Sequence, residues 1–241
     1  MLIVSGRSSS TRYVDATHGG VGAPPLCCQR IPDTRLAHSI ADDRTALLTS
    51  FAVLQSATLA LGRREGFTVG LLFYWLVWCL LLPFALLGRA GFRELFGRST
   101  REIRMRESVL LMLPPVVGFT SIFPLLLWIG EPRLFVVAAT IAIVNGTCEE
   151  VLWRGTYLKV FGNRLWGGVL YPAIGFGLWH VAPIAVHWSW SPGRALALAA
   201  CAALVGLMYG LVARHTGSIR WTILSHILMN VAGLGALSYF A

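Results

Sequence analysis

Two adjacent glutamates, Glu149 and Glu150, lie inside a long apolar stretch and are the last two acidic residues of the chain. An ionisable side chain near the centre of a bilayer costs at least about 2.5 kcal/mol on insertion scales, so it normally faces a polar interior and carries function. Glu150 and Arg154 are four residues apart and share a helical face, which predicts an ion pair. Glu149 is rotated by about 100° around the helix and has no basic residue four positions away. We therefore expect Glu149 to be the carboxylate that does chemistry.

Two later apolar segments carry side chains that would act with a glutamate. Phe176 and His180 are spaced i, i+4 in GFGLWH, and His226 and Asn230 have the same spacing in SHILMN, so each pair shares a helical face. A single intramembrane histidine is more often a core residue than a catalytic group. Polar residues on three separate segments, with Glu149 and His226 at similar depths for a rise of about 1.5 Å per residue, favour one shared site. A carboxylate and an imidazole together can deprotonate water.

The segments that must position these side chains are expected to be transmembrane helices. The chain of 241 residues is 56% hydrophobic and 13% charged, and its mean hydropathy is +0.66. Apolar runs long enough to cross a bilayer, about 20 residues each, recur through the sequence, and period-2 alternation is absent, so helices must satisfy the backbone. We expect an all-α polytopic bundle of six to seven spans, placed at 46–62, 68–88, 107–129, 134–158, 166–187, 195–213 and 219–240.

Arginines between the expected spans indicate the orientation of the chain. They crowd a loop at 89–106, which the positive-inside rule places in the cytoplasm. This rule explains the formal charge of +9 better than a nucleic-acid partner does, and we expect no such partner. Residues 1–45 are polar and lack apolar periodicity, so we expect a disordered cytoplasmic tail, followed by one membrane-embedded domain over 46–241. The Arg-rich, Lys-poor composition favours a bacterial cytoplasmic membrane.

The motifs, taken in order, resemble those of the CPBP family of membrane proteases, which process CaaX proteins and bacteriocins and include the Ras-converting endopeptidase. The family patterns EExxxR, FxxxH and HxxxN correspond to Glu149, Glu150 and Arg154, then to Phe176 and His180, then to His226 and Asn230. The resemblance covers 134–240 and carries no motif in 1–133. It implies an all-helical fold with a four-helix catalytic core.

The resemblance also implies an activity. It indicates an intramembrane endopeptidase in which Glu149 and His180 activate the water that attacks the scissile carbonyl, while His226 and Asn230 hold the developing oxyanion. It assigns supporting roles to Glu150, Arg154 and Phe176. The expected partners are a membrane-associated peptide or protein substrate and the lipid bilayer, and the identity of the substrate stays open.

Alternatives to this interpretation concern the metal and the function. Glu149, His180 and His226 are a plausible three-ligand zinc set with one open position. The sequence has no HExxH pairing and no carboxylate besides Glu150 to orient such ligands, so we expect a metal-free glutamate mechanism and no cofactor. Competing functions are a non-catalytic scaffold or bacteriocin-immunity protein, which would make Glu149 dispensable, and a proton-coupled transporter. A transporter would be expected to show paired broken helices in two halves, which the sequence lacks.

Overall fold

The computed structural model describes residues 63–129, 132–162, 164–182 and 191–234, with short pieces at 52–53, 56–57 and 60–61. The expected tail at 1–45 and most of the expected span at 46–62 lie outside these residues. Within the described part all regular structure is helical and no strand is present, which confirms the all-α class.

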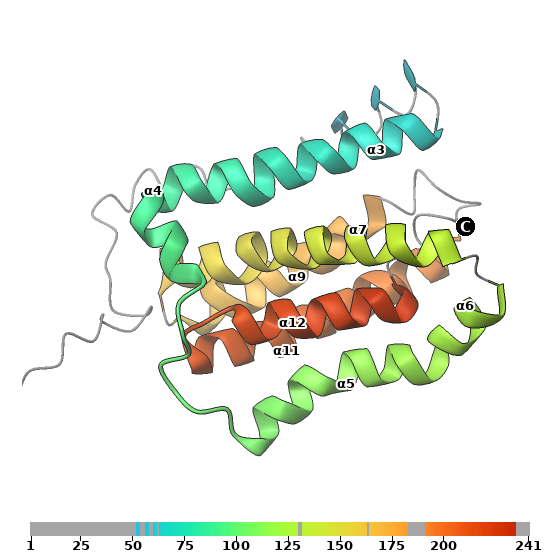
Figure 1. Cartoon of the computed structure of the whole chain (residues 1–241). Helices are drawn as coiled ribbons and strands as arrows, with labels where there is room; N and C mark the ends of the chain where they lie inside the picture. The colour runs from blue at the N-terminus through green and yellow to red at the C-terminus, as the bar shows by residue number, and fades with distance from the viewer. Residues whose placement is uncertain are drawn as a thin grey trace, which may run out of the picture.

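Several of the rods are built from α-helical and π-helical pieces that join without a break (Figure 1). In chain order the pieces are α3 (Arg63–Phe73), η1 (Tyr74–Leu81), α4 (Leu82–Leu95), α5 (Met105–Ser121), α6 (Phe123–Ile129), α7 (Pro132–Glu150), η2 (Val151–Thr156), α8 (Tyr157–Phe161), η3 (Trp166–Leu170), α9 (Tyr171–Trp179), α11 (Pro192–Thr216), α12 (Arg220–Met229) and η4 (Asn230–Leu234), where η denotes a π-helix. Short π-helical insertions are frequent at functional sites. Two of them carry residues of the expected motifs: Arg154 lies in η2, and Asn230 is the first residue of η4.

The helices run side by side, with α7, α9, α11 and α12 grouped between two flanking rods (Figure 1). The α3–η1–α4 rod covers one side of the group and α5 covers the other, where it contacts α12 and α11. Helix α9 packs along α11 at close range: a Cβ atom added to Gly177 would lie 2.5 Å from the backbone oxygen of Ala199. Small residues thus allow the two backbones to approach, as is common between membrane helices.

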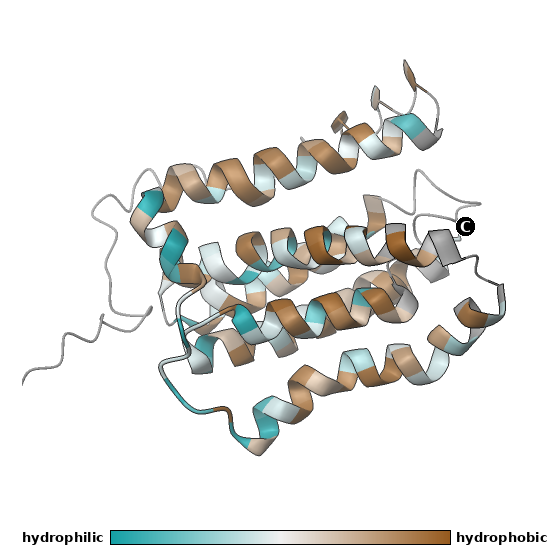
Figure 2. Cartoon of the chain, in the orientation of Figure 1, coloured by the Kyte–Doolittle hydropathy of each residue, from teal (hydrophilic) through white to brown (hydrophobic). Residues whose placement is uncertain are grey.

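Apolar side chains cover the flanks of the rods, and hydrophilic residues gather toward their ends (Figure 2). Among the described residues, two helical stretches are long and apolar enough to cross a membrane by length and composition, Glu65–Leu95 and Ala195–Thr216. The count of six to seven spans therefore stays a prediction. The exposed aliphatic residues on the rods, among them Leu76, Val116 and Leu204, are suited to contact with lipid.

The segment 89–106 is only partly the loop that the sequence predicts. Helix α4 continues to Leu95 after a sharp bend at Gly88, whose φ of 64° and ψ of 175° are readily adopted only by glycine. Beyond the bend, Arg93 is exposed while Leu95 is buried. The predicted loop was wrong over 89–95, because the amphipathic pattern there supports about two further helical turns at the end of the bundle.

The predicted span 107–129 is divided into α5 and α6, and α5 carries two prolines in its interior. Because Pro115 has no N–H group, the carbonyl of Leu111 lacks its usual helical partner. Ser225 of α12 donates a hydrogen bond to this carbonyl, and its own oxygen lies 2.7 Å from the hydroxyl of Tyr209 on α11. Side chains of two neighbouring helices thus satisfy the backbone of α5.

Candidate active site

The end of α7 brings two carboxylates into the interior of the bundle. Glu149 and Glu150 are the last residues of α7, and the π-helix η2 that follows carries Arg154. The exposed fractions of Glu149, Glu150 and Arg154 are 2%, 0% and 1%. Charges that are this deeply buried require partners, since an uncompensated ion in a protein interior costs several kcal/mol.

Two charged or polar side chains lie close to one carboxylate oxygen of Glu150. Its Oε1 atom lies 3.2 Å from Nη1 of Arg154, which is the ion pair that the spacing predicts, and 2.8 Å from Nδ1 of His226 on α12. The guanidinium of Arg154 also lies over the ring of Phe176, with 4.2 Å between its Cζ atom and the ring centroid. This cation–π contact holds the arginine against α9.

Glu149 is contacted from three helices. Its Oε2 atom accepts a hydrogen bond of 2.8 Å from Nδ2 of Asn145, one turn earlier on α7, and lies 3.5 Å from Nε2 of His226. Its Oε1 atom is 3.5 Å from the hydroxyl of Tyr74 at the start of η1. His226 therefore lies between the two glutamates, with one ring nitrogen facing each carboxylate.

Phe176 lies between the two histidines. Its ring meets that of His180 at a centroid distance of 4.6 Å and that of His226 at 5.9 Å, both edge to face. Nδ1 of His180 lies 2.8 Å from the backbone oxygen of Phe176. Because a carbonyl only accepts hydrogen bonds, this contact assigns the proton to Nδ1 and leaves Nε2 of His180 with a free lone pair.

His180 and Asn230 complete the set. His180 interacts electrostatically with both Glu149 and His226, and no hydrogen bond joins it to Glu149 among the contacts that the structure describes. Asn230, one turn beyond His226 on the same rod, is 6% exposed. Its Nδ2 atom is buried without a hydrogen-bond partner within the described part of the chain. An amide that is buried and unpaired in this way is available to an incoming acceptor.

The structure thus gathers the residues of all three motifs, and it adds others that the sequence interpretation missed. Asn145 stands four residues before Glu149, a spacing that was visible in the sequence but that alone does not distinguish it from other polar helix residues. Tyr74 lies in a segment with no recognisable motif, and no signal in the sequence indicated that it would reach Glu149.

No three histidine, cysteine, aspartate or glutamate side chains of the described residues are grouped closely enough to hold a metal ion. As placed, Glu149, His180 and His226 therefore do not form the three-ligand zinc set that was considered from the sequence, and we derive no catalytic step through a metal.

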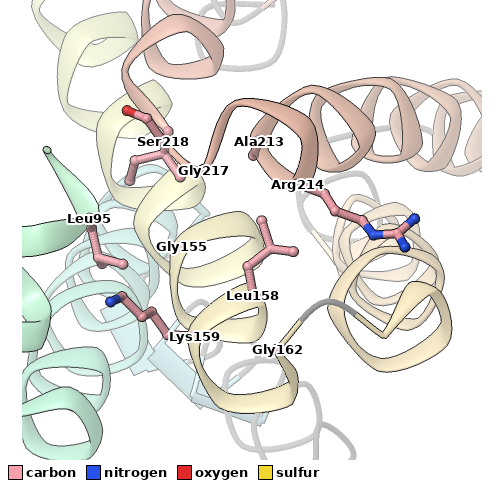
Figure 3. A pocket seen from close by; sticks show the side chains of 10 residues that line it. Leu95, Gly155, Leu158, Lys159, Gly162, Ala213, Arg214, Gly217 and Ser218 are labelled. Carbon is pink, nitrogen blue, oxygen red and sulfur yellow. The ribbon is translucent and has the colours of Figure 1, made fainter. Parts of the chain in front are cut away.

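A separate hollow opens near the end of the bundle where α8 meets the turn between α11 and α12 (Figure 3). Its lining is Leu95, Gly155, Leu158, Lys159, Gly162, Ala213, Arg214, Gly217, Ser218 and Ile219. Nζ of Lys159 is paired with Oε2 of Glu94 at 2.6 Å. None of the residues from the three motifs lines this hollow, so it is distinct from the candidate site.

Comparison with known proteins places the candidate site in a family. Residues 131–232 match the family described as Type II CAAX prenyl endopeptidase Rce1-like, and this segment includes all three motifs. No curated protein matches the chain, and no solved structure matches it. Together with the apolar helices, the family match indicates an integral membrane protein. Residues 131–232 of the chain are therefore similar to the CAAX prenyl endopeptidases of this family.

Proposed function

We propose that the protein is an intramembrane endopeptidase that hydrolyses a peptide bond of a membrane-associated peptide or protein. The observation that carries this proposal is the buried cluster of Glu149, Glu150, Arg154 and His226, with His180 and Asn230 beside it. Burying two carboxylates, a guanidinium and an imidazole is costly, and a fold that needed only apolar packing would be at least as stable without them. Such a cluster in a family of proteases supports a catalytic use.

In the proposed reaction, Glu149 is the general base. A water molecule held between its carboxylate and the free Nε2 lone pair of His180 gives its proton to Glu149 as its oxygen attacks the carbonyl carbon of the substrate. The electrostatic interaction between Glu149 and His180 supports this pairing. Glu149 then returns the proton to the nitrogen of the leaving amine as the carbon–nitrogen bond breaks, so that the site ends the cycle in its starting state.

The negative charge that develops on the carbonyl oxygen needs hydrogen-bond donors. We assign this role to Nε2 of His226 and Nδ2 of Asn230, which lie one turn apart on the α12–η4 rod. The Asn230 amide is buried without a protein partner among the described residues, which supports the assignment, since such a donor gives up no described protein hydrogen bond when it binds the oxyanion. Glu150 and Arg154 would fix the position of His226 through its Nδ1 atom.

The orientation of the bundle follows from its charged end. We propose that the end carrying the exposed Arg89, Arg93, Arg98 and Arg101 faces the cytoplasm. These residues lie on the last turns of α4 and on the connection to α5, at the end of the bundle that Figure 2 shows as hydrophilic. Labelling of a single cysteine introduced at Arg98 with a membrane-impermeant reagent, in sealed vesicles of known orientation, tests this assignment.

The proposed activity is tested by comparing wild type with Glu149→Gln, which keeps the shape of the side chain and removes the base. The variants are expressed in a host without the native gene, and new protein C-termini in the membrane fraction are identified by mass spectrometry. We expect cleavage products with wild type, and at least about a 100-fold loss with Glu149→Gln. Glu102→Gln, at an exposed position, is the matched control and should cleave as wild type does. Equal products from wild type and Glu149→Gln would contradict the proposal and favour a scaffold function.

A further inference from the structure

Both carboxylate oxygens of Glu149 are contacted by side chains outside the three motifs. We propose that Asn145 and Tyr74 are positioning residues for Glu149, so that the α3–η1 rod, which precedes the segment matched to the family, forms part of the catalytic unit. This inference rests on the proposed function, in which Glu149 is the base. It concerns what holds that base in place.

Asn145 is itself fixed by a second hydrogen bond. Its Nδ2 atom donates to Oε2 of Glu149 at 2.8 Å, and its Oδ1 atom accepts from Nε1 of Trp75 on η1, also at 2.8 Å. An indole N–H only donates and a carboxylate only accepts, so these two neighbours permit one orientation of the amide group. Trp75 therefore determines that Asn145 presents its N–H group, and not its oxygen, to the glutamate.

Tyr74 is held in a similar way. Its hydroxyl accepts a hydrogen bond of 2.7 Å from Nε1 of Trp153 on η2. Since the indole supplies that hydrogen, the hydroxyl of Tyr74 can donate its own proton to Oε1 of Glu149, 3.5 Å away, and the thiol of Cys79 also interacts with this hydroxyl. The ring of Tyr74 is 2% exposed and stacks on Trp179, the residue before His180, at 4.0 Å between centroids. Tyr74 thus contacts Glu149 itself and Trp179, the residue that precedes His180.

These contacts restrict the carboxylate. A glutamate side chain has three rotatable bonds, and without partners it would sample many positions. A donor on each oxygen, anchored in turn by an indole on η1 or η2, limits this freedom and keeps Oε2 near Nε2 of His226. Misplacement of a catalytic group by about 1 Å can cost about 100-fold in rate. The expected consequence of losing these donors is a slower chemical step with unchanged binding of substrate.

The test uses the full-length protein in detergent or liposomes, with a peptide that wild type cleaves. We expect Tyr74→Phe and Asn145→Leu to lower kcat by about 10-fold or more while KM stays within about twofold of the wild-type value. Tyr157→Phe is the matched control, because Tyr157 is another buried tyrosine of the same aromatic cluster, and it should leave both constants unchanged. Thermal unfolding of each variant is measured in parallel, and so is the double variant Tyr74→Phe with Glu149→Gln. The double variant should be no slower than Glu149→Gln alone.

The outcomes separate the two proposals. If Glu149→Gln cleaves as well as wild type, the proposed function itself fails. If Glu149→Gln is inactive but Tyr74→Phe and Asn145→Leu keep the wild-type kcat, the positioning role is overturned and the proposed function stands. If Tyr74→Phe and Asn145→Leu lose thermal stability together with kcat, and Tyr157→Phe loses both as well, the positioning role is overturned and these residues serve the fold alone.

Discussion

Replacing Arg154 by methionine tests the electrostatic argument for the buried cluster. Arg154 is 1% exposed and its partner Glu150 is 0% exposed, with 3.2 Å between the two charged groups. Methionine keeps a long, flexible side chain that can fill the same space. It removes the positive charge and leaves the carboxylate of Glu150 facing His226.

The expected cost comes from two contributions. Breaking a buried ion pair by removing one member typically destabilises a protein by about 3 to 5 kcal/mol, because the other charge stays buried without compensation. The lost contact of the guanidinium with the face of Phe176, at 4.2 Å, adds about 0.5 to 2 kcal/mol. We therefore expect Arg154→Met to reduce the free energy of unfolding by at least about 3 kcal/mol.

The measurement is unfolding in mixed micelles with increasing denaturing detergent, monitored by circular dichroism. Arg98→Met is the matched control, since Arg98 is exposed, and it should change stability by less than about 0.5 kcal/mol. The double variant Arg154→Met with Glu150→Leu removes both charges and should recover part of the loss. The reasoning is refuted if Arg154→Met is as stable as Arg98→Met, or if the double variant is less stable than Arg154→Met alone.

Three further expectations address packing, backbone satisfaction and metal dependence. Ser225→Ala should reduce the free energy of unfolding by about 1 to 3 kcal/mol, because it leaves the carbonyl of Leu111 buried and unpaired. The control in the same unfolding assay is Ser108→Ala, which removes a more exposed hydroxyl that donates a hydrogen bond to the backbone of its own helical segment. Gly177→Val should disrupt the contact between α9 and α11, because a Cβ atom at this position would already lie 2.5 Å from a backbone oxygen. The yield of folded protein should fall well below that of the control Gly193→Val, where no atom lies within 4 Å of the added Cβ. Peptide cleavage by wild type should persist after dialysis against a zinc chelator, and a loss that added zinc restores would replace the glutamate mechanism with a metal-dependent one.

Local spacing predicted the part of the site that lies on single helices. The i, i+4 rule identified the Glu150–Arg154 pair, which is present at 3.2 Å, because both residues belong to one continuous helical rod even where it becomes π-helical. The same rule applied to Asn145 and Glu149. This spacing alone does not predict their hydrogen bond, since an asparagine one turn from a glutamate is common on helices and carries no charge that requires a partner.

Contacts between distant segments could not be predicted from the sequence. Tyr74 and Glu149 are 75 positions apart, and their contact depends on how the α3–η1 rod packs against α7. Ser225 and Leu111 are 114 positions apart, and their bond depends on the proline that frees a carbonyl in α5. The bend at Gly88 was missed for a different reason: a glycine allows a positive φ but does not require it, so only the packing of the following turn determines where the helix changes direction.

The position of His226 between the two glutamates changes how the cluster balances its charge. The sequence interpretation divided the glutamates, with Glu150 neutralised by Arg154 and Glu149 left for chemistry. In the structure His226 faces both, with Nδ1 at 2.8 Å from Glu150 and Nε2 at 3.5 Å from Glu149. Two carboxylates and one guanidinium leave one negative charge, and both carboxylates face the ring of His226.

A cluster whose total charge stays constant through the reaction is suited to peptide hydrolysis in a medium of low dielectric constant. In the proposed mechanism the proton of the attacking water moves to Glu149, so the negative charge leaves that carboxylate as an equal charge appears on the substrate oxygen. The new charge forms beside the N–H groups that we assign to His226 and Asn230, and the total charge of the site does not change. Moving a charge between two positions that already have hydrogen-bond donors costs less inside a protein than creating a charge there. In the proposed mechanism, the distance of 3.5 Å between His226 and Glu149 would therefore lower the barrier that burial would otherwise raise.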